Sequence, residues 1–134
     1  MENIGFRESL TVEFKSDRKC LSNDDIIDVV VAFSNTDGGE LYLGVEDDGT
    51  ITGLHPSHQD ATQLAAFIAN RTVPPVSVRV ETLTYDQTPI LKIFVSRKTS
   101  IVACSPGKIL RRRLKANGEP ENVPLYPYEI VNRL

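Results

Sequence analysis

The 134-residue sequence has no tryptophan, two cysteines and no long apolar run. Cys20 and Cys104 stand alone, without a CxxC pair or a nearby histidine at ligand spacing, so the sequence does not predict a structural zinc site. Lone cysteines are typical of the reducing cytosol, where a buried thiol acts as a small apolar group. No segment approaches the roughly 20 apolar residues that span a bilayer, and the N-terminus lacks the basic and apolar regions of a signal peptide. These absences predict a cytoplasmic protein with no membrane partner.

Basic residues are scarce in the first two thirds of the chain and abundant in the last third. Residues 1–91 contain 6 Lys and Arg against 15 Asp and Glu, whereas residues 92–134 contain 9 against 3. The net charge of −3 and the pI of 5.4 exclude indiscriminate electrostatic binding to nucleic acid, so any such binding must come from a local patch. The composition, 40% hydrophobic and 25% charged, is typical of one globular domain spanning residues 1–134.

Apolar residues recur at strand spacing and at helix spacing in turn along the chain. Strands are predicted at 9–15, 40–45, 50–54, 76–80, 90–95, 101–104 and 108–114. Helices are predicted after the caps Ser22 and Ser57 and over 126–134, with a loop at 115–124. This order predicts an α+β fold: a single layered domain with a mixed, mostly antiparallel sheet, two main helices and a short C-terminal helix.

The turn Asn35-Thr36-Asp37-Gly38-Gly39 separates the first predicted helix from the second predicted strand. Gly38 and Gly39 suit a helix C-cap, because glycine adopts a positive φ at little cost. Exposed N–H groups in such a turn can also cradle a phosphate. The two roles are compatible, and the residues leave both open.

Several segments, taken in order, resemble the Schlafen AlbA-like domain family. The matching residues are Glu8, Glu13-Phe14-Lys15, Ala32-Phe33-Ser34-Asn35-Thr36-Asp37-Gly38-Gly39, Gly44-Val45-Glu46-Asp47-Asp48-Gly49 and Gly53. The resemblance covers nearly the whole chain, and residues 32–53 are its most specific part. Near the C-terminus the family often has a strand with an arginine followed by Gly-Ser, and here Lys115-Ala116 replaces Gly-Ser after the arginine strand 110–114.

The resemblance implies a domain that binds DNA or RNA, commonly as the N-terminal part of bacterial transcriptional regulators or helicase-related proteins. The chain is therefore expected to be the N-terminal part of a longer protein. In some Schlafen proteins the similar domain is an endoribonuclease that uses three acidic residues. Here these match Glu8, Glu13 and Glu46, with Asp47 as the second choice for the third.

The three carboxylates would hold Mg²⁺ or Mn²⁺ if the domain is a nuclease, because hard cations prefer carboxylate oxygens. The alternative places Glu13 on the solvent face of its strand, opposite Val12 and Phe14, where it pairs with Lys15 or Arg18. If the domain is not a nuclease, we expect no cofactor. ATP binding is not supported, because Pro106-Gly107-Lys108 lacks the GxxxxGK[ST] spacing.

The strand around 108–114 carries the densest positive charge. Strand alternation places Arg111 and Arg113 on one face and Arg112 on the other. The predicted phosphate contacts are Lys108, Arg111, Arg113 and Lys115, extended by Arg97 and Lys98. The alternative is a solvated, charged edge strand that discourages aggregation.

Two further interpretations concern weaker signals. His55 and His58 lie three residues apart but have no third ligand nearby in the sequence, so they are predicted to occupy a surface loop. A third class of function is a protein-interaction module, in which strand edges pair between copies to form a homodimer.

Overall fold

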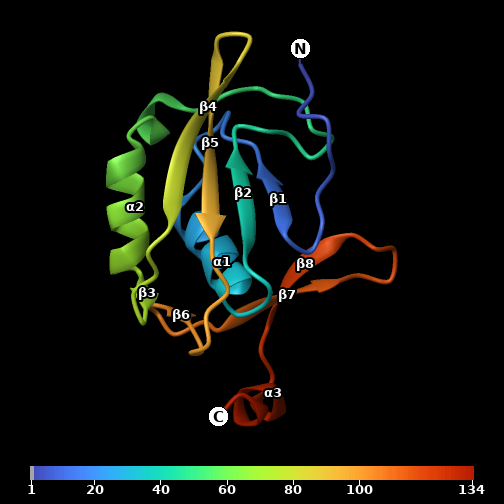
Figure 1. Cartoon of the computed structure of the whole chain (residues 1–134), viewed down its shortest axis with the longest axis vertical. Coiled ribbons are helices and arrows are strands. Elements are labelled where there is room, and N and C mark those ends of the chain that lie inside the picture. The colour runs from blue at the N-terminus through green and yellow to red at the C-terminus, as the bar shows by residue number, and fades with distance from the viewer. Residues whose placement is uncertain (1) are drawn as a thin grey trace.

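A computed structural model describes residues 2–134 of the chain. Its main sheet has the strand order β1–β2–β5–β4, with β1 (Val12–Lys15) parallel to β2 (Gly39–Leu43). Strand β5 (Thr88–Val95) is antiparallel to both β2 and β4 (Arg79–Tyr85). Figure 1 shows α1 (Asn23–Ser34) crossing behind this sheet and α2 (Ala61–Asn70) beside β4.

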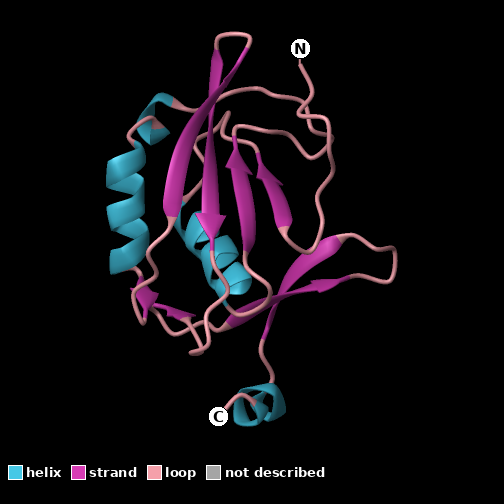
Figure 2. Cartoon of the chain, viewed as in Figure 1, coloured by secondary structure: helices cyan, strands magenta, loops and turns pink. Residues whose placement is uncertain are grey.

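Smaller elements surround the sheet. Strand β3 (Thr72–Val73) pairs with β6 (Ala103–Cys104), and β7 (Leu110–Leu114) pairs with β8 (Pro120–Pro124) as an antiparallel hairpin. A short 3₁₀ helix, η1 (Pro56–His58), precedes α2, and α3 (Pro127–Asn132) follows the hairpin. Figure 2 shows the hairpin projecting from one side of the sheet and α3 lying beyond it. The predicted α+β fold is confirmed, including its mixed sheet, two main helices and short C-terminal helix.

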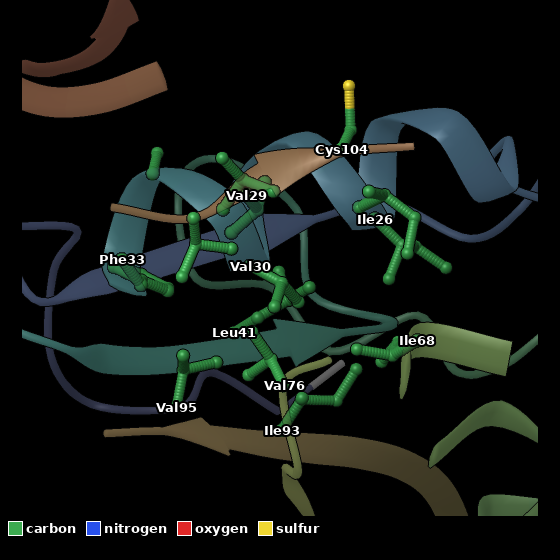
Figure 3. Packing of buried hydrophobic residues seen from close by; sticks show 14 of the residues in the cluster. Ile26, Val29, Val30, Phe33, Leu41, Ile68, Val76, Ile93, Val95 and Cys104 are labelled. Atoms are coloured by element: carbon green, nitrogen blue, oxygen red, sulfur yellow. The ribbon is translucent and has the colours of Figure 1, made fainter. Parts of the chain in front are cut away.

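The main core lies between α1 and the sheet. Ser22 caps α1, because its hydroxyl accepts a hydrogen bond from the Asp25 N–H at 3.2 Å, as predicted. Every residue from Val29 to Ser34 is buried, so this helix has little polar surface to offer water. Figure 3 shows Val30 and Phe33 directed toward Leu41, Ile93 and Val95 of the sheet.

A second apolar cluster covers the opposite face of the sheet, and it corrects the predicted orientation of β1. Phe14 is fully buried in this second cluster, together with Ile4, Tyr42, Val45, Ile51 and Ile90. Glu13 is paired in register with Leu41, so its side chain lies on the same face as α1 rather than on a solvent face. The alternation was predicted correctly, but both faces of the sheet are covered.

Four predictions of local structure were wrong. The strand predicted at 76–80 begins at Arg79 instead, as β4. Residues 50–54 form two isolated bridges, Asn3 to Thr50 and Val45 to Ile51, instead of a strand. Residues 115–124 are not all loop, because β8 pairs with β7 and its prolines stand at the two ends of the ladder. The cap of α2 is Asp60, which accepts from the Gln63 N–H at 3.0 Å, whereas Ser57 lies inside η1.

Within residues 2–134, no helix combines the length and the apolar character that crossing a bilayer requires.

Candidate functional site

A buried arginine joins the β7–β8 hairpin to the rest of the domain. Arg112 is 2% exposed, and its Nη1 donates to Glu13 Oε1 at 2.5 Å. Its guanidinium also lies 4.8 Å from the centroid of the Phe33 ring. The remaining donors go to the carbonyl oxygens of Ser9, Leu10 and Val12 and to the side chain of Asn122. The guanidinium and the Glu13 carboxylate therefore compensate each other where water is excluded.

The turn at 35–39 fixes this hairpin from the other side. The Asn35 side chain donates to the carbonyl oxygens of Val102 and Leu110 and accepts from the Val102 N–H, at 2.7–2.9 Å. The Thr36 hydroxyl donates to the Ala32 carbonyl and accepts from the Arg112 N–H, both at 2.8 Å.

The glycines of the turn are required by close approach. A Cβ on Gly39 would lie 2.5 Å from the Phe33 ring. Gly38 has a φ of +75° and lies against the backbone of residues 95–97, which leaves no room for a Cβ.

The N–H groups of Asn35, Thr36 and Gly38 donate to carbonyl oxygens of α1. These three N–H groups are therefore already hydrogen-bonded within the domain. They do not support the prediction that the turn binds a phosphate.

A polar groove of about 850 Å³ lies between the N-terminal segment, the acidic turn at 47–48 and the tip of the β7–β8 hairpin. Figure 1 shows the N-terminal segment running down beside β1 toward this hairpin. We call this space the hairpin groove. Its lining residues are Phe6, Arg7, Glu8, Glu13, Lys15, Asp47, Asp48, Lys115, Asn117, Gly118, Glu119 and Pro120. The groove therefore collects cations, carboxylates and one exposed aromatic ring from three segments that are distant in sequence.

The predicted carboxylates Glu8 and Glu13 meet in the hairpin groove. Glu8 Oε2 accepts from the Phe14 N–H at 3.0 Å. Burial, followed by the hydrogen bond shared with Glu13, raises the pKa of Glu8 from 4.5 to about 8, and the charge of Asp47 adds to this rise. Glu8 is therefore mostly protonated at neutral pH, as expected when two carboxyl groups share a proton.

The third predicted carboxylate, Glu46, does not line the hairpin groove. Its Oε2 accepts from the Thr52 hydroxyl at 2.6 Å, and it borders an adjoining hollow that is also lined by Arg18, Thr50 and the groove residues Asp47 and Asp48. Asp47, the second choice from the sequence, lines the groove with Glu8 and Glu13. The ligand atoms of these three residues are not all within 4.8 Å of one another.

The predicted cations do not form one surface. Lys108 pairs with Asp28 at 2.8 Å, Arg113 with Glu121 at 2.8 Å and Arg97 with Asp37 at 4.0 Å. Lys108, Lys98 and Lys115 border three different hollows. Of the six predicted contacts, Lys115 is the one that lines the hairpin groove.

Arg111 is covered by the C-terminal helix. Its Nε lies 2.6 Å from Glu129 Oε2 of α3, and its side chain is 20% exposed. The distance is that of an ion pair, but the Nε–H does not point at the carboxylate oxygen well enough to form a hydrogen bond. Arg111 and Arg113 point away from the buried side of β7, as strand alternation predicted, and both are neutralised by carboxylates.

Strand patterns did not identify Arg7 or Phe6 as site residues. Neither lies in a periodic element, and Arg7 was one of few cations in an acidic region of the chain. Their proximity to Lys115 depends on the position of the hairpin, which sequence spacing does not report. The only available signal was that both precede Glu8, the first residue of the family resemblance.

The family pattern described as Schlafen, AlbA_2 matches residues 8–119, and the chain belongs to this family. This match confirms the resemblance seen in the sequence. The family is associated with nucleic-acid binding.

A solved structure shows the same fold. The DIP2311 protein from Corynebacterium diphtheriae is 22% identical with a TM-score of 0.70, and the match covers 87% of this chain and 25% of that one. The N-terminal domain of a RecG-related protein from Nitrosomonas europaea is also 22% identical, with a TM-score of 0.48 over 67% of this chain and 65% of that one. The chain thus spans a quarter of the length of the Corynebacterium protein.

Proposed function

We propose that this domain binds DNA or RNA in the hairpin groove and serves as the N-terminal module of a bacterial transcriptional regulator. The observation that carries the proposal is the meeting of two unpaired cations, Arg7 and Lys115, beside an exposed aromatic ring. Among residues 2–134, neither cation has a carboxylate within 4 Å. Cations without an internal partner are free to contact phosphates.

The carboxylates of the groove are less repulsive to a phosphate than their number suggests. Glu8 is mostly protonated at neutral pH, and Glu13 is compensated by Arg112. The charged residues left are Asp47, Asp48 and Glu119 against Arg7, Lys15 and Lys115. The groove is therefore close to electrically balanced, and Arg7 and Lys115 are the cations in it that a phosphate can contact.

Phe6 offers a second kind of contact. Its ring is 41% exposed while it packs edge-on against Tyr42, with 5.3 Å between the ring centroids. An exposed ring held by other rings is suited to stacking with an unpaired base, which contributes about 1–3 kcal/mol in single-strand-binding proteins. This supports binding to single-stranded segments.

The proposal is tested by fluorescence anisotropy with labelled single-stranded and duplex DNA and RNA. Replacing Arg7 and Lys115 by alanine should weaken binding about tenfold and lower the salt slope by roughly 2, since each phosphate contact contributes about 1. The matched control replaces the exposed Arg71 and Arg79, which lie outside the groove. Equal losses in both pairs of variants would contradict the groove as the binding site.

A metal-dependent endoribonuclease is the second candidate, favoured by the presence of Glu8, Glu13 and Asp47 along one groove. These carboxylates could hold Mg²⁺ or Mn²⁺, and a bound ion would activate water or stabilise the leaving oxygen. The test incubates structured RNA with Mn²⁺ and compares wild type with Asp47→Asn.

Glu46→Gln is the matched control for this nuclease test, because Glu46 lies next to Asp47 but outside the groove. Cleavage that is lost in Asp47→Asn and kept in Glu46→Gln supports the nuclease. Absence of cleavage in wild type, or equal cleavage in all three proteins, rejects it.

A further inference from the structure

A second polar cluster lies away from the hairpin groove, between the segments that precede α1 and α2. Asp17 and Cys20 belong to the loop between β1 and α1, and His58 ends η1. One ligand atom from each residue lies within 4.8 Å of the other two. Among residues 2–134, no other group of three His, Cys, Asp or Glu side chains meets this distance.

The cluster overturns two sequence predictions. His58 is 7% exposed rather than on a surface loop, and Cys20 has a histidine near it although none was near in the sequence. The two residues are brought together by the packing of η1 against the loop that precedes α1. Spacing along the chain could not indicate this contact.

Asp17 is held firmly as an acceptor. It is fully buried, and its two carboxylate oxygens accept from the N–H groups of Leu21 and His55, both at 2.8 Å. His58 Nδ1 lies 2.8 Å from Oδ1 and 3.0 Å from Oδ2. Backbone N–H groups thus hold the Asp17 carboxylate in place. A metal ion can replace the proton that lies between this carboxylate and His58 Nδ1.

We propose that Asp17, Cys20 and His58 bind a Zn²⁺ ion that joins the loop before α1 to the segment before α2. A thiolate, an imidazole and a carboxylate form a ligand set that zinc accepts, whereas Mg²⁺ and Ca²⁺ prefer oxygen ligands alone. This site is independent of the function proposed for the hairpin groove.

The geometry is close to what the ion requires. Bond lengths of about 2.0–2.3 Å in a tetrahedral site place neighbouring ligand atoms roughly 3.3–3.6 Å apart. The nitrogen–oxygen contact of 2.8–3.0 Å must therefore widen by about half an ångström. The Cys20 thiol lies within the 4.8 Å limit and can close on the ion by turning about its side-chain bonds.

A cavity of about 280 Å³ borders the cluster at His58, whereas Asp17 and Cys20 do not line it. Its other lining side chains are polar at Asn23, Ser57, Asp60 and Gln63 and apolar at Leu64 and Phe67. On the His58 side the cavity has room for a water molecule as fourth ligand, as in three-ligand zinc sites that keep an open position.

The test titrates Co²⁺, a spectroscopic substitute for Zn²⁺, into the reduced, metal-free full chain. We expect a thiolate-to-cobalt charge-transfer band that saturates at one ion per chain and disappears when Zn²⁺ is added. Cys20→Ser and His58→Gln should lose the band. Cys104→Ser and His55→Gln should keep it, since these residues lie outside the cluster. Circular dichroism of each variant verifies that it is folded.

A second measurement needs no variant. Zn²⁺ should slow the modification of Cys20 by a thiol reagent at least tenfold, with the modified residue identified by mass spectrometry. Unchanged modification of Cys20 at saturating Zn²⁺, or a cobalt band that survives in Cys20→Ser, would overturn the proposed site. Loss of the band in Cys104→Ser would also overturn it, because the ligand would then be the other thiol.

Discussion

At the scale of single residues, the buried guanidinium of Arg112 determines how the domain holds its hairpin. Strand alternation correctly placed Arg112 on the opposite face from Arg111 and Arg113. The sequence analysis, however, predicted a role in phosphate binding only for Arg111 and Arg113. The partner of Arg112 is Glu13, 99 residues earlier in the chain. A contact over that distance has no signature in local periodicity, so the sequence showed which face Arg112 is on but not what it meets there.

Removal of Arg112 should be far more destabilising than removal of its neighbour. Arg112→Ala leaves the Glu13 carboxylate buried without compensation, and the expected loss is about 3–5 kcal/mol of unfolding free energy. Arg113→Ala removes an exposed pair with Glu121 and should cost less than about 1 kcal/mol. Urea denaturation of both variants measures the difference, and similar losses would contradict the structural role of Arg112.

Glu8 should make stability depend on pH in the metal-free protein. Its pKa is about 8 in the folded domain and 4.5 in the unfolded chain, so the folded state binds more protons between these values. The stabilisation is complete below pH 4.5 and is lost as the pH rises toward 8.

Urea denaturation at a series of pH values, with a chelator present, tests this dependence. Glu8→Gln should flatten the decline, because the amide does not titrate. Glu46→Gln is the control, because Glu46 lies outside the groove, where it accepts from Thr52. This variant should keep the decline of the wild type. An identical slope in wild type and Glu8→Gln would show that the raised pKa of Glu8 does not contribute.

At the scale of elements, the C-terminal helix competes with any ligand of β7. Glu129 Oε2 of α3 lies 2.6 Å from Arg111 Nε and pairs with it. The other carboxylate oxygen of Glu129 accepts a hydrogen bond from the Tyr126 N–H at 2.9 Å. The helix was predicted at 126–134, but its contact with Arg111 was not. Strand β8 was missed for a related reason, because a strand bounded by two prolines is stabilised by its partner rather than by its own apolar pattern.

Neutralising Glu129 should strengthen nucleic-acid binding by adding a phosphate contact at Arg111, outside the hairpin groove. Glu129→Gln keeps an oxygen to cap α3 but releases Arg111, and we expect a gain in affinity of about two- to fivefold at low salt. The control is Glu81→Gln, which removes the same charge from β4, where Glu81 pairs with Arg79. If both variants gain equally, the effect reflects net charge and not the release of Arg111.

At the scale of the whole molecule, the overall class was predictable and the site was not. Helix caps, strand alternation and the Asn35–Gly39 turn define the α+β arrangement locally, and the turn proves to bind the hairpin through Asn35 and Thr36. The hairpin groove is made by the N-terminal segment, the acidic turn and the hairpin tip. Such a site depends on tertiary packing. The charge pattern identified Lys115 and the family resemblance suggested Asp47, but neither showed that the two residues share a groove.

The central claim is that nucleic acid binds in the hairpin groove, and chemical-shift mapping of the isotope-labelled domain tests it most directly. Titration with a short single-stranded oligonucleotide should shift the amide signals of Phe6, Arg7, Lys115 and Gly118, with little change around Lys98 and Lys108. The shifts should fade as salt is raised, because phosphate contacts release counterions. Saturable binding with shifts gathered around Lys98 and Lys108, and none at the groove, would contradict the account.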